Sequence, residues 1–276
     1  MKKKKILFIS QEITPYLEEN ELGHFGRYLP QGIQEDGKEI RTFMPKFGCI
    51  NERRNQLHEV IRLSGMNLII NENDHPLIIK VGSIQAARMQ VYFIDSEDYF
   101  QRKAVFHDKE TGKFFKDNDE RAIFFVRGVL ETVKKLGWVP DIIHCHGWMT
   151  SLVPLYIKTS FKKEPIFENS KVVFSLYNNE FDKPLDKNFA KKAMMDGISE
   201  EAIAAYNDTS FVGVNKAAID ASDAVIMASE TINPELEKYF NASEKPKLAY
   251  QTPENYVNAY SKFYDEILET EDVLQD

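Results

Sequence analysis

Three carboxylates lie within four residues, at Glu18, Glu19 and Glu21, shortly after the apolar run KILFIS. Such a run is typical of a buried strand, and the loop between a first strand and a helix is where α/β proteins commonly bind phosphate. They do so with glycine, backbone N–H groups and a cation, whereas glutamates repel the anion. These residues either have a function or simply form a solvated acidic loop, and both alternatives remain open. In neither case can the loop clamp a phosphate.

Two histidines, His144 and His146, alternate within the apolar run PDIIHCH and can therefore point to the same side of a strand. This spacing suggests a metal site, but zinc needs three or four ligands and no third ligand follows at a suitable distance. We therefore expect structural histidines and no bound metal. Trp148, at the head of the helical pattern that follows, is expected to pack in the core rather than to stack on a sugar.

Tyr177 and Asn178 end another apolar run, KVVFSLY, at the position where open α/β sheets place their binding sites. They are the polar residues best placed to contact a sugar. Asp117, Asp119 and Glu120 resemble an acid–base cluster, but acidic residues in the first turn of a helix stabilise its dipole, and we favour that role.

Apolar, strand-like runs alternate with helical patterns along the chain, which predicts a Rossmann-like, doubly wound and mostly parallel α/β sheet. Between residues 57 and 94 the apolar runs are short and have no helical period, so we expect hairpins at one side of the sheet. The other predicted strands are 5–10, 39–44, 140–146, 171–177 and 223–229. The predicted helices are 22–36, 117–137, 148–159, 233–240 and 253–269.

The composition of the 276 residues, with 43% hydrophobic and 28% charged side chains, is that of a soluble globular protein. A net charge of −8 argues against nucleic acid or an anionic membrane as the main partner. The apolar stretch behind the lysines at 2–5 ends at Ile9, which is too short for an export signal or a membrane span. Because Cys49 and Cys145 suggest no disulfide framework, a reduced cytoplasmic location is expected.

Several long segments match the motifs of one enzyme family in the same order. They are KILFISQEITPYL, VYFIDSEDYFQRKAVF, DNDERAIFFVRGVLETVKKLGWVPDIIHCHGWMTSLVPLYIK and KVVFSLYNNEF. Over roughly residues 1–245 the sequence thus resembles glycogen and starch synthases of glycosyltransferase family five. The resemblance implies the N-terminal half of a two-domain GT-B glycosyltransferase. It also implies transfer of glucose from ADP-glucose to an α-1,4-glucan, with retention of configuration and without a metal or other cofactor.

In this sequence the donor loop departs from the motif of the family. The family has a Lys-Thr-Gly-Gly motif whose lysine contacts the phosphate of the nucleotide sugar, followed by an aspartate. The aligned residues are Glu18, Glu19, Asn20, Glu21 and, for the aspartate, His24. A unit charge pair at 4 Å is worth about 4 kcal/mol at an effective dielectric near 20, so replacing lysine by glutamate is a nominal swing of about 8 kcal/mol before screening. We expect this loop to reject a diphosphate, so that ADP-glucose binds weakly at best.

Two further active-site motifs of the family are altered. Its His-x-His-Asp-Trp run corresponds to HCHGW, so Gly147 replaces the aspartate, and its His-Asn dipeptide has tyrosine in place of histidine. The family's active-site positions are therefore His146, Gly147, Trp148, Tyr177 and Asn178. With these groups replaced, we expect no catalytic residue among them.

After Ser243 no run matches the second half of the family. We therefore expect one starch-synthase-like domain at 1–246, a C-terminal helix within 247–276 that docks on it, and no second GT-B domain. The expected protein is a glycogen synthase homologue impaired in catalysis, a pseudoenzyme that acts in glycogen metabolism as an α-glucan-binding or regulatory partner of a second protein chain. Two alternatives remain open: half of a split active synthase, and a purely structural subunit of an assembly.

The segment 252–268 predicts an amphipathic helix, with Thr252 as N-cap and Pro253 in the first turn. Its apolar residues recur at three- and four-residue spacing and form one stripe. They are Tyr256, Ala259, Tyr260, Phe263, Ile267 and Leu268. An exposed stripe of this kind favours aggregation, so we expect it to be buried against the preceding domain.

Overall fold

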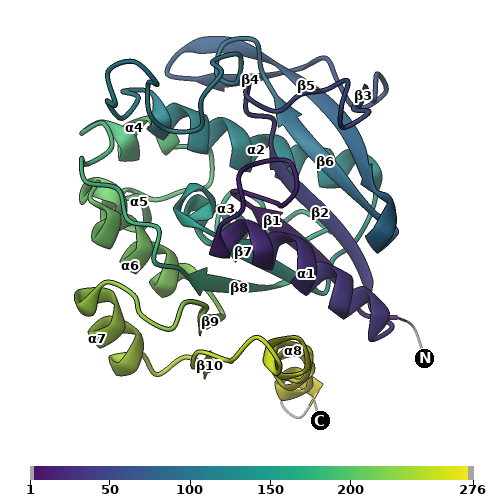
Figure 1. The fold of residues 1–276 in the computed structure, drawn as a ribbon. Coiled ribbons are helices and arrows are strands. Elements are labelled where there is room, and N and C mark those ends of the chain that lie inside the picture. Colours follow the sequence, from purple (N-terminus) through teal and green to yellow (C-terminus); the bar gives the residue numbers. More distant parts are fainter. Residues whose placement is uncertain (1–2, 273–276) are drawn as a thin grey trace.

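The computed structural model describes residues 3–272, whose strands form one twisted sheet (Figure 1). The strands are β1 (Lys5–Ser10), β2 (Glu39–Pro45), β3 (His58–Glu59), β4 (Met66–Ile70), β5 (Asn73–Ile84), β6 (Met89–Asp95), β7 (Ile142–His146), β8 (Lys171–Leu176), β9 (Ala224–Met227) and β10 (Lys247–Leu248). Their order is β10-β9-β8-β7-β1-β2-β6-β5-β3, with β4 paired to β5. All pairs from β10 to β6 are parallel, which confirms the expected mostly parallel sheet.

Helices cover both faces of this sheet. They are α1 (Glu21–Glu35), α2 (Asn118–Leu136), α3 (Leu152–Lys158), α4 (Phe189–Ala193), α5 (Glu200–Ala204), α6 (Phe211–Ala221), α7 (Pro234–Ala242) and α8 (Tyr256–Asp272). Side chains alternate along β1: Ile6 and Phe8 lie in the core under α1 and α8. Leu7 and Ile9 lie in the larger core on the other face, with α2, α3 and α6. Within residues 3–272, none of the helices combines the length and the apolar character that crossing a bilayer requires.

The hairpin region expected at 57–94 forms one side of the sheet. Strands β3, β4 and β5 add to it in antiparallel pairs, and β6 joins this region to the parallel strand β2. The apolar runs there are short because the segments turn back on one another, and β5 pairs in this way with β3, β4 and β6.

Helix α1 is held close to the loop that follows β1. Its buried stripe consists of Leu22, Phe25, Leu29 and Ile33. A Cβ atom at Gly26 would lie 2.3 Å from the backbone oxygen of Glu12, so only glycine permits this approach. The helix and the loop are therefore held against each other by contacts within the chain.

The predicted helices differ from the observed ones in two places. Helix α8 begins at Tyr256 after a turn in which the Tyr256 N–H donates to the carbonyl of Thr252 at 3.0 Å, so the expected start at Pro253 with Thr252 as N-cap is wrong. The short helices α4, α5 and α6 lie in a stretch, 180–222, where no helix was predicted. The five residues of α4 and of α5 are too short to show a helical period, whereas α6 has eleven residues and was missed despite its length.

Helix α8 packs on the face of the sheet next to α1. Its side chains Tyr256, Tyr260, Phe263, Tyr264 and Ile267 are buried in one core with Phe25 of α1 and with Phe8, Ile142 and Val173 of the sheet. The interior also contains a polar contact, because the Tyr264 hydroxyl lies 2.5 Å from Nδ1 of His144. The apolar stripe is therefore covered within this chain.

We predict that removing residues 247–276 lowers the melting temperature by several degrees and increases the binding of a hydrophobic dye. Each large side chain of the stripe contributes roughly 1.5–3 kcal/mol on burial, before the entropy of ordering is subtracted. A chain that ends at Glu269 keeps the stripe and is the matched control. Equal melting curves for the full chain and for the chain that lacks residues 247–276, measured by calorimetry, would contradict the prediction.

Candidate functional site

The loop between β1 and α1 satisfies the first backbone N–H groups of α1 by itself. The side-chain oxygen of Asn20 accepts from the N–H of Gly23 at 2.8 Å, and its backbone oxygen accepts from the N–H of His24 at 2.9 Å. The Asn20 amide in turn donates to Oε2 of Glu12 at 2.5 Å. Of the N–H groups that a helix N-terminus offers to an anion, that of Gly23 is therefore already bonded, whereas the His24 bond is the first one within the helix itself.

Glu21 brings a negative charge to the same helix end. Its carboxylate accepts a hydrogen bond from the hydroxyl of Ser229, beyond the end of β9. The oxygen of that hydroxyl accepts from the backbone N–H of Asn178 at 2.9 Å, so three segments meet at this point. A carboxylate at the first residue of a helix stabilises the dipole, as a bound anion would. The fold thus supplies its own anion where the family binds a phosphate.

Glu18 and Glu19 are exposed beside Glu21. Among residues 3–272, none of these three glutamates has a cationic group within 4.0 Å. Their charge is therefore uncompensated, and a phosphate 4 Å from one of them would be repelled by about 4 kcal/mol at an effective dielectric near 20.

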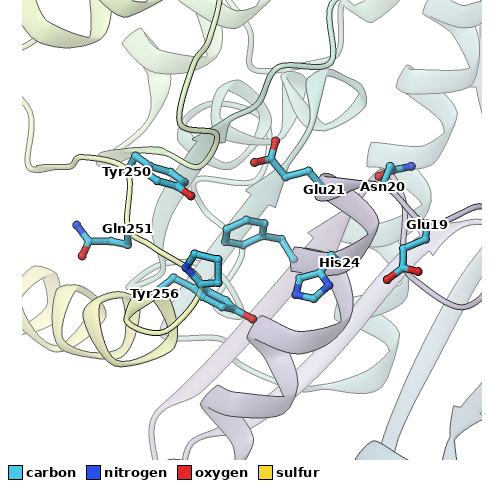
Figure 2. A pocket seen from close by; sticks show the side chains of 9 residues that line it. Glu19, Asn20, Glu21, His24, Tyr250, Gln251 and Tyr256 are labelled. Atoms are coloured by element: carbon cyan, nitrogen blue, oxygen red, sulfur yellow. The ribbon is translucent and has the colours of Figure 1, made fainter.

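Two cavities lie on either side of this loop, and Asn20 lines both. The first, here named the aromatic pocket, has a volume of about 370 Å³ and is lined by Glu19, Glu21, His24, Phe25, Tyr250 and Tyr256, among others (Figure 2). The second, here named the loop groove, has a volume of about 660 Å³. Its polar lining consists of Glu12, Glu18, Asn20, Arg54, His107 and Lys109. The five positions of the family's donor loop are thereby divided between two different cavities.

His144 and His146 lie on the same side of β7, with ring centroids 3.9 Å apart, and both are fully buried. His144 Nε2 contacts the Ser175 hydroxyl at 2.7 Å, opposite the Tyr264 contact. His146 Nδ1 contacts the Tyr177 hydroxyl at 2.6 Å. Burial lowers the pKa of His144 well below its usual value, and it lowers the pKa of His146 to about 3. Both rings are therefore neutral, and each is held in place by hydroxyl groups.

Tyr177 does not face a ligand. Its side chain is 2% exposed and its hydroxyl is turned inward to His146, so the expectation that it contacts a sugar is wrong. Burial raises the pKa of Tyr177 well above its usual value, which keeps the phenol neutral. Asn178 is exposed at the carboxyl end of β8, in agreement with its position in the sequence. The direction of a side chain at a strand end follows from the core around it, which the sequence pattern does not contain.

Gly147 has a φ of +89°, and a Cβ there would lie 2.8 Å from Oε1 of Gln11 and 2.9 Å from Cδ1 of Leu22. That Gln11 oxygen accepts from the backbone N–H of Met149 at 3.3 Å. The family's aspartate therefore does not fit this backbone. Trp148 is buried against Phe106, Phe114 and Phe181 and presents no free ring face to a sugar.

The acidic residues at the start of α2 are paired with cations. Asp117 forms two hydrogen bonds with Arg102, at 2.9 and 2.6 Å, and makes no capping hydrogen bond through its side chain. Lys192 lies 2.8 Å from Asp119 and 2.9 Å from Glu120. These pairs add to the favourable dipole interaction and make the cluster structural. Lys192 was missed because it belongs to α4, a helix with no detectable period.

The sequence profile of the family described as the starch synthase catalytic domain matches residues 5–247. Glycogen synthase of Pelodictyon phaeoclathratiforme is 34% identical over 237 residues, which are 85% of this chain and 48% of that protein. Glycogen synthase of Chlorobium luteolum is 41% identical over 174 residues, which are 63% of this chain and 36% of that protein. This chain spans about half the length, or less, of these curated relatives.

A solved structure shows the same fold. The catalytic domain of Starch Synthase IV from Arabidopsis thaliana, bound to ADP and acarbose, superimposes with a TM-score of 0.74 at 19% identity. The match covers 91% of this chain and 52% of that one. The expected fold class, the N-terminal Rossmann-like half of a GT-B glycosyltransferase, is thereby confirmed.

We predict that Gly147→Ala destabilises the protein by about 3 kcal/mol or more, because it combines a left-handed backbone with a steric clash. Gly137→Ala is the matched control: Gly137 has a φ of +60° and nothing within 4 Å of its Cβ position, so a loss of about 1 kcal/mol is expected. Urea unfolding gives both values. Equal losses would show that Gly147 is not crowded.

We predict that stability falls with acidification below pH ~6.5, the usual pKa of histidine in an unfolded chain. His144 and His146 have lowered pKa values in the fold, so the unfolded state binds more protons than the folded state. The unfolded state is therefore stabilised relative to the folded state as the pH falls. The slope reaches about 1.4 kcal/mol per pH unit for each histidine. Urea unfolding between pH 7 and pH ~5 measures it.

In the variant His146→Gln the free energy of unfolding should depend less steeply on pH in this range. The control His24→Gln changes a partly exposed histidine and should keep the slope of the unchanged protein. An unchanged slope in His146→Gln would contradict the assignment.

Proposed function

The chain belongs to the family of starch synthase catalytic domains, and on that premise we propose that it binds α-glucan without transferring glucose from ADP-glucose. In this role it acts in glycogen metabolism as a glucan-binding or regulatory partner of another chain. Residues 1–246 are then the glucan-binding domain, and α8 closes one of its faces.

The arrangement at the start of α1 carries this proposal. The amides of Gly23 and His24 are bonded to Asn20, and the Glu21 carboxylate lies at the same helix end. A diphosphate arriving there meets negative charge, and the Asn20 side chain already bonds the N–H of Gly23. Transfer of a glucosyl group requires stabilisation of charge on the departing phosphate, and nothing in this loop supplies it.

The loop groove supports the glucan part of the proposal. A sugar hydroxyl both donates and accepts hydrogen bonds, and the groove offers acceptors in Glu12 and Glu18 and donors in Arg54 and Lys109. Its volume of about 660 Å³ is in the range of pockets for ligands larger than one sugar ring. Starch Synthase IV was solved with both ADP and acarbose, and we propose that only an oligosaccharide of the acarbose kind is bound here.

We predict that maltoheptaose binds in isothermal titration and that Arg54→Ala together with Lys109→Ala weakens binding about thirtyfold. Each lost hydrogen bond from a charged donor costs of the order of 1 kcal/mol or more. Arg53→Ala, in an exposed neighbour that does not line the groove, is the control and should bind as the unchanged protein does. Failure of maltoheptaose to bind at any workable concentration would refute the glucan role.

We also predict that ADP-glucose gives no measurable binding and that labelled glucose is not incorporated into glycogen by this protein alone. The physical reason is the repulsion by the donor loop and the bonded amides of α1. Incorporation well above a blank without protein would overturn this half of the proposal and favour an active transferase.

A further inference from the structure

The aromatic pocket, unlike the loop groove, combines an apolar lining with charge of one sign. We propose that it binds an organic cation, a guanidinium or primary ammonium group carried on a short aliphatic chain. Its volume of about 370 Å³ accommodates a ligand of that size. The inference does not rest on glucan binding, because the two cavities lie on different sides of the loop.

The two walls of the pocket come from distant parts of the sequence. Figure 2 shows Glu21 and His24 of α1 on one side and Tyr250 and Gln251, from the segment before α8, on the other. Between them lie the rings of Phe25 and Tyr256, whose centroids are 4.8 Å apart at an angle of 60°. The negative faces of such rings attract cations, more strongly where water is excluded.

The two carboxylates of the pocket have no cationic partner among the residues that the structure describes, and Glu21 is held by a hydrogen bond. The hydroxyl of Ser229 bonds Oε2 of Glu21, and Oε1 makes no hydrogen bond to the residues that the structure describes. Glu19 has no cationic neighbour within 4.0 Å in the same part of the chain. A cation that leaves water for the aromatic floor thus finds two carboxylates at the rim, an arrangement that favours both its charge and its apolar stem.

Other classes of ligand fit less well. An anion at the start of α1 would lie beside the carboxylates of Glu19 and Glu21, and the Asn20 side chain already bonds the N–H of Gly23. A neutral sugar would stack on the same rings but would gain nothing from the net charge of Glu19 and Glu21. Dependence of binding on those two charges therefore separates a cation from a sugar.

The test is isothermal titration of the full chain with agmatine and, separately, with a blocked tripeptide that contains one arginine. Both should bind at low salt and bind several-fold more weakly when sodium chloride is raised from about 20 to about 200 mM. Glu19→Gln combined with Glu21→Gln should weaken binding about tenfold. Glu18→Gln changes the neighbouring acid that lines the other cavity, and it should leave the affinity unchanged.

A second pair of variants guards against a folding defect from the loss of Glu21. Tyr250→Leu should weaken binding about threefold to fivefold by removing the ring, while Tyr250→Phe should keep the affinity. Tighter binding of the peptide assigns the cation to a protein partner, and tighter binding of agmatine assigns it to a free amine. No binding of either probe at about 10 mM, or binding that is insensitive to both glutamate changes, would overturn the proposal.

Discussion

The N-terminus of α1 must satisfy its own backbone donors, and the candidate site depends on how it does so. Asn20 bonds the amides of Gly23 and His24, and Glu21 brings a fixed negative charge to the helix end. In a phosphate-binding loop the ligand would complete these bonds. Here Asn20 caps the helix and Glu21 supplies a negative charge from the chain itself, so the helix end is stabilised without a ligand and an anion is repelled. The same residues separate the aromatic pocket from the loop groove.

A second constraint is the pair of neutral histidines beneath α8. Three of their four ring nitrogens lie within hydrogen-bonding distance of the hydroxyls of Ser175, Tyr177 and Tyr264, which come from β8, from the end of β8 and from α8, and Nε2 of His146 has no partner among the described residues. The contact of His144 with Tyr264 adds a polar constraint to the apolar stripe of α8, so the two together fix the position of this helix. The position of α8 also places Tyr256 in the wall of the aromatic pocket. The tail thus shapes the site as well as covering the core.

The sequence predicted the parallel sheet, α1 and α2 because periods of two and 3.6 residues persist there over long apolar runs, and it predicted the hairpin region because the runs there are short and have no helical period. It also located the acidic loop, since charge at Glu18, Glu19 and Glu21 is visible without coordinates. It did not predict that Tyr177 turns inward to His146 or that Gly147 is crowded by Gln11, because both depend on contacts between segments that are not adjacent in the chain. The short helices α4 and α5 were not predicted for a different reason. They are stabilised by tertiary contacts, such as the ion pairs of Lys192 in α4, and not by local helix propensity.

The contact between His144 and Tyr264 joins residues that are 120 positions apart in the chain. A ribosome adds about 5–20 residues per second, so the histidine pair emerges roughly 6–24 s before the tyrosine that covers it. During that interval the nascent chain carries an uncovered apolar face beside β1 and β7. Such a face is what molecular chaperones recognise, and α8 is the helix that ends their access to it.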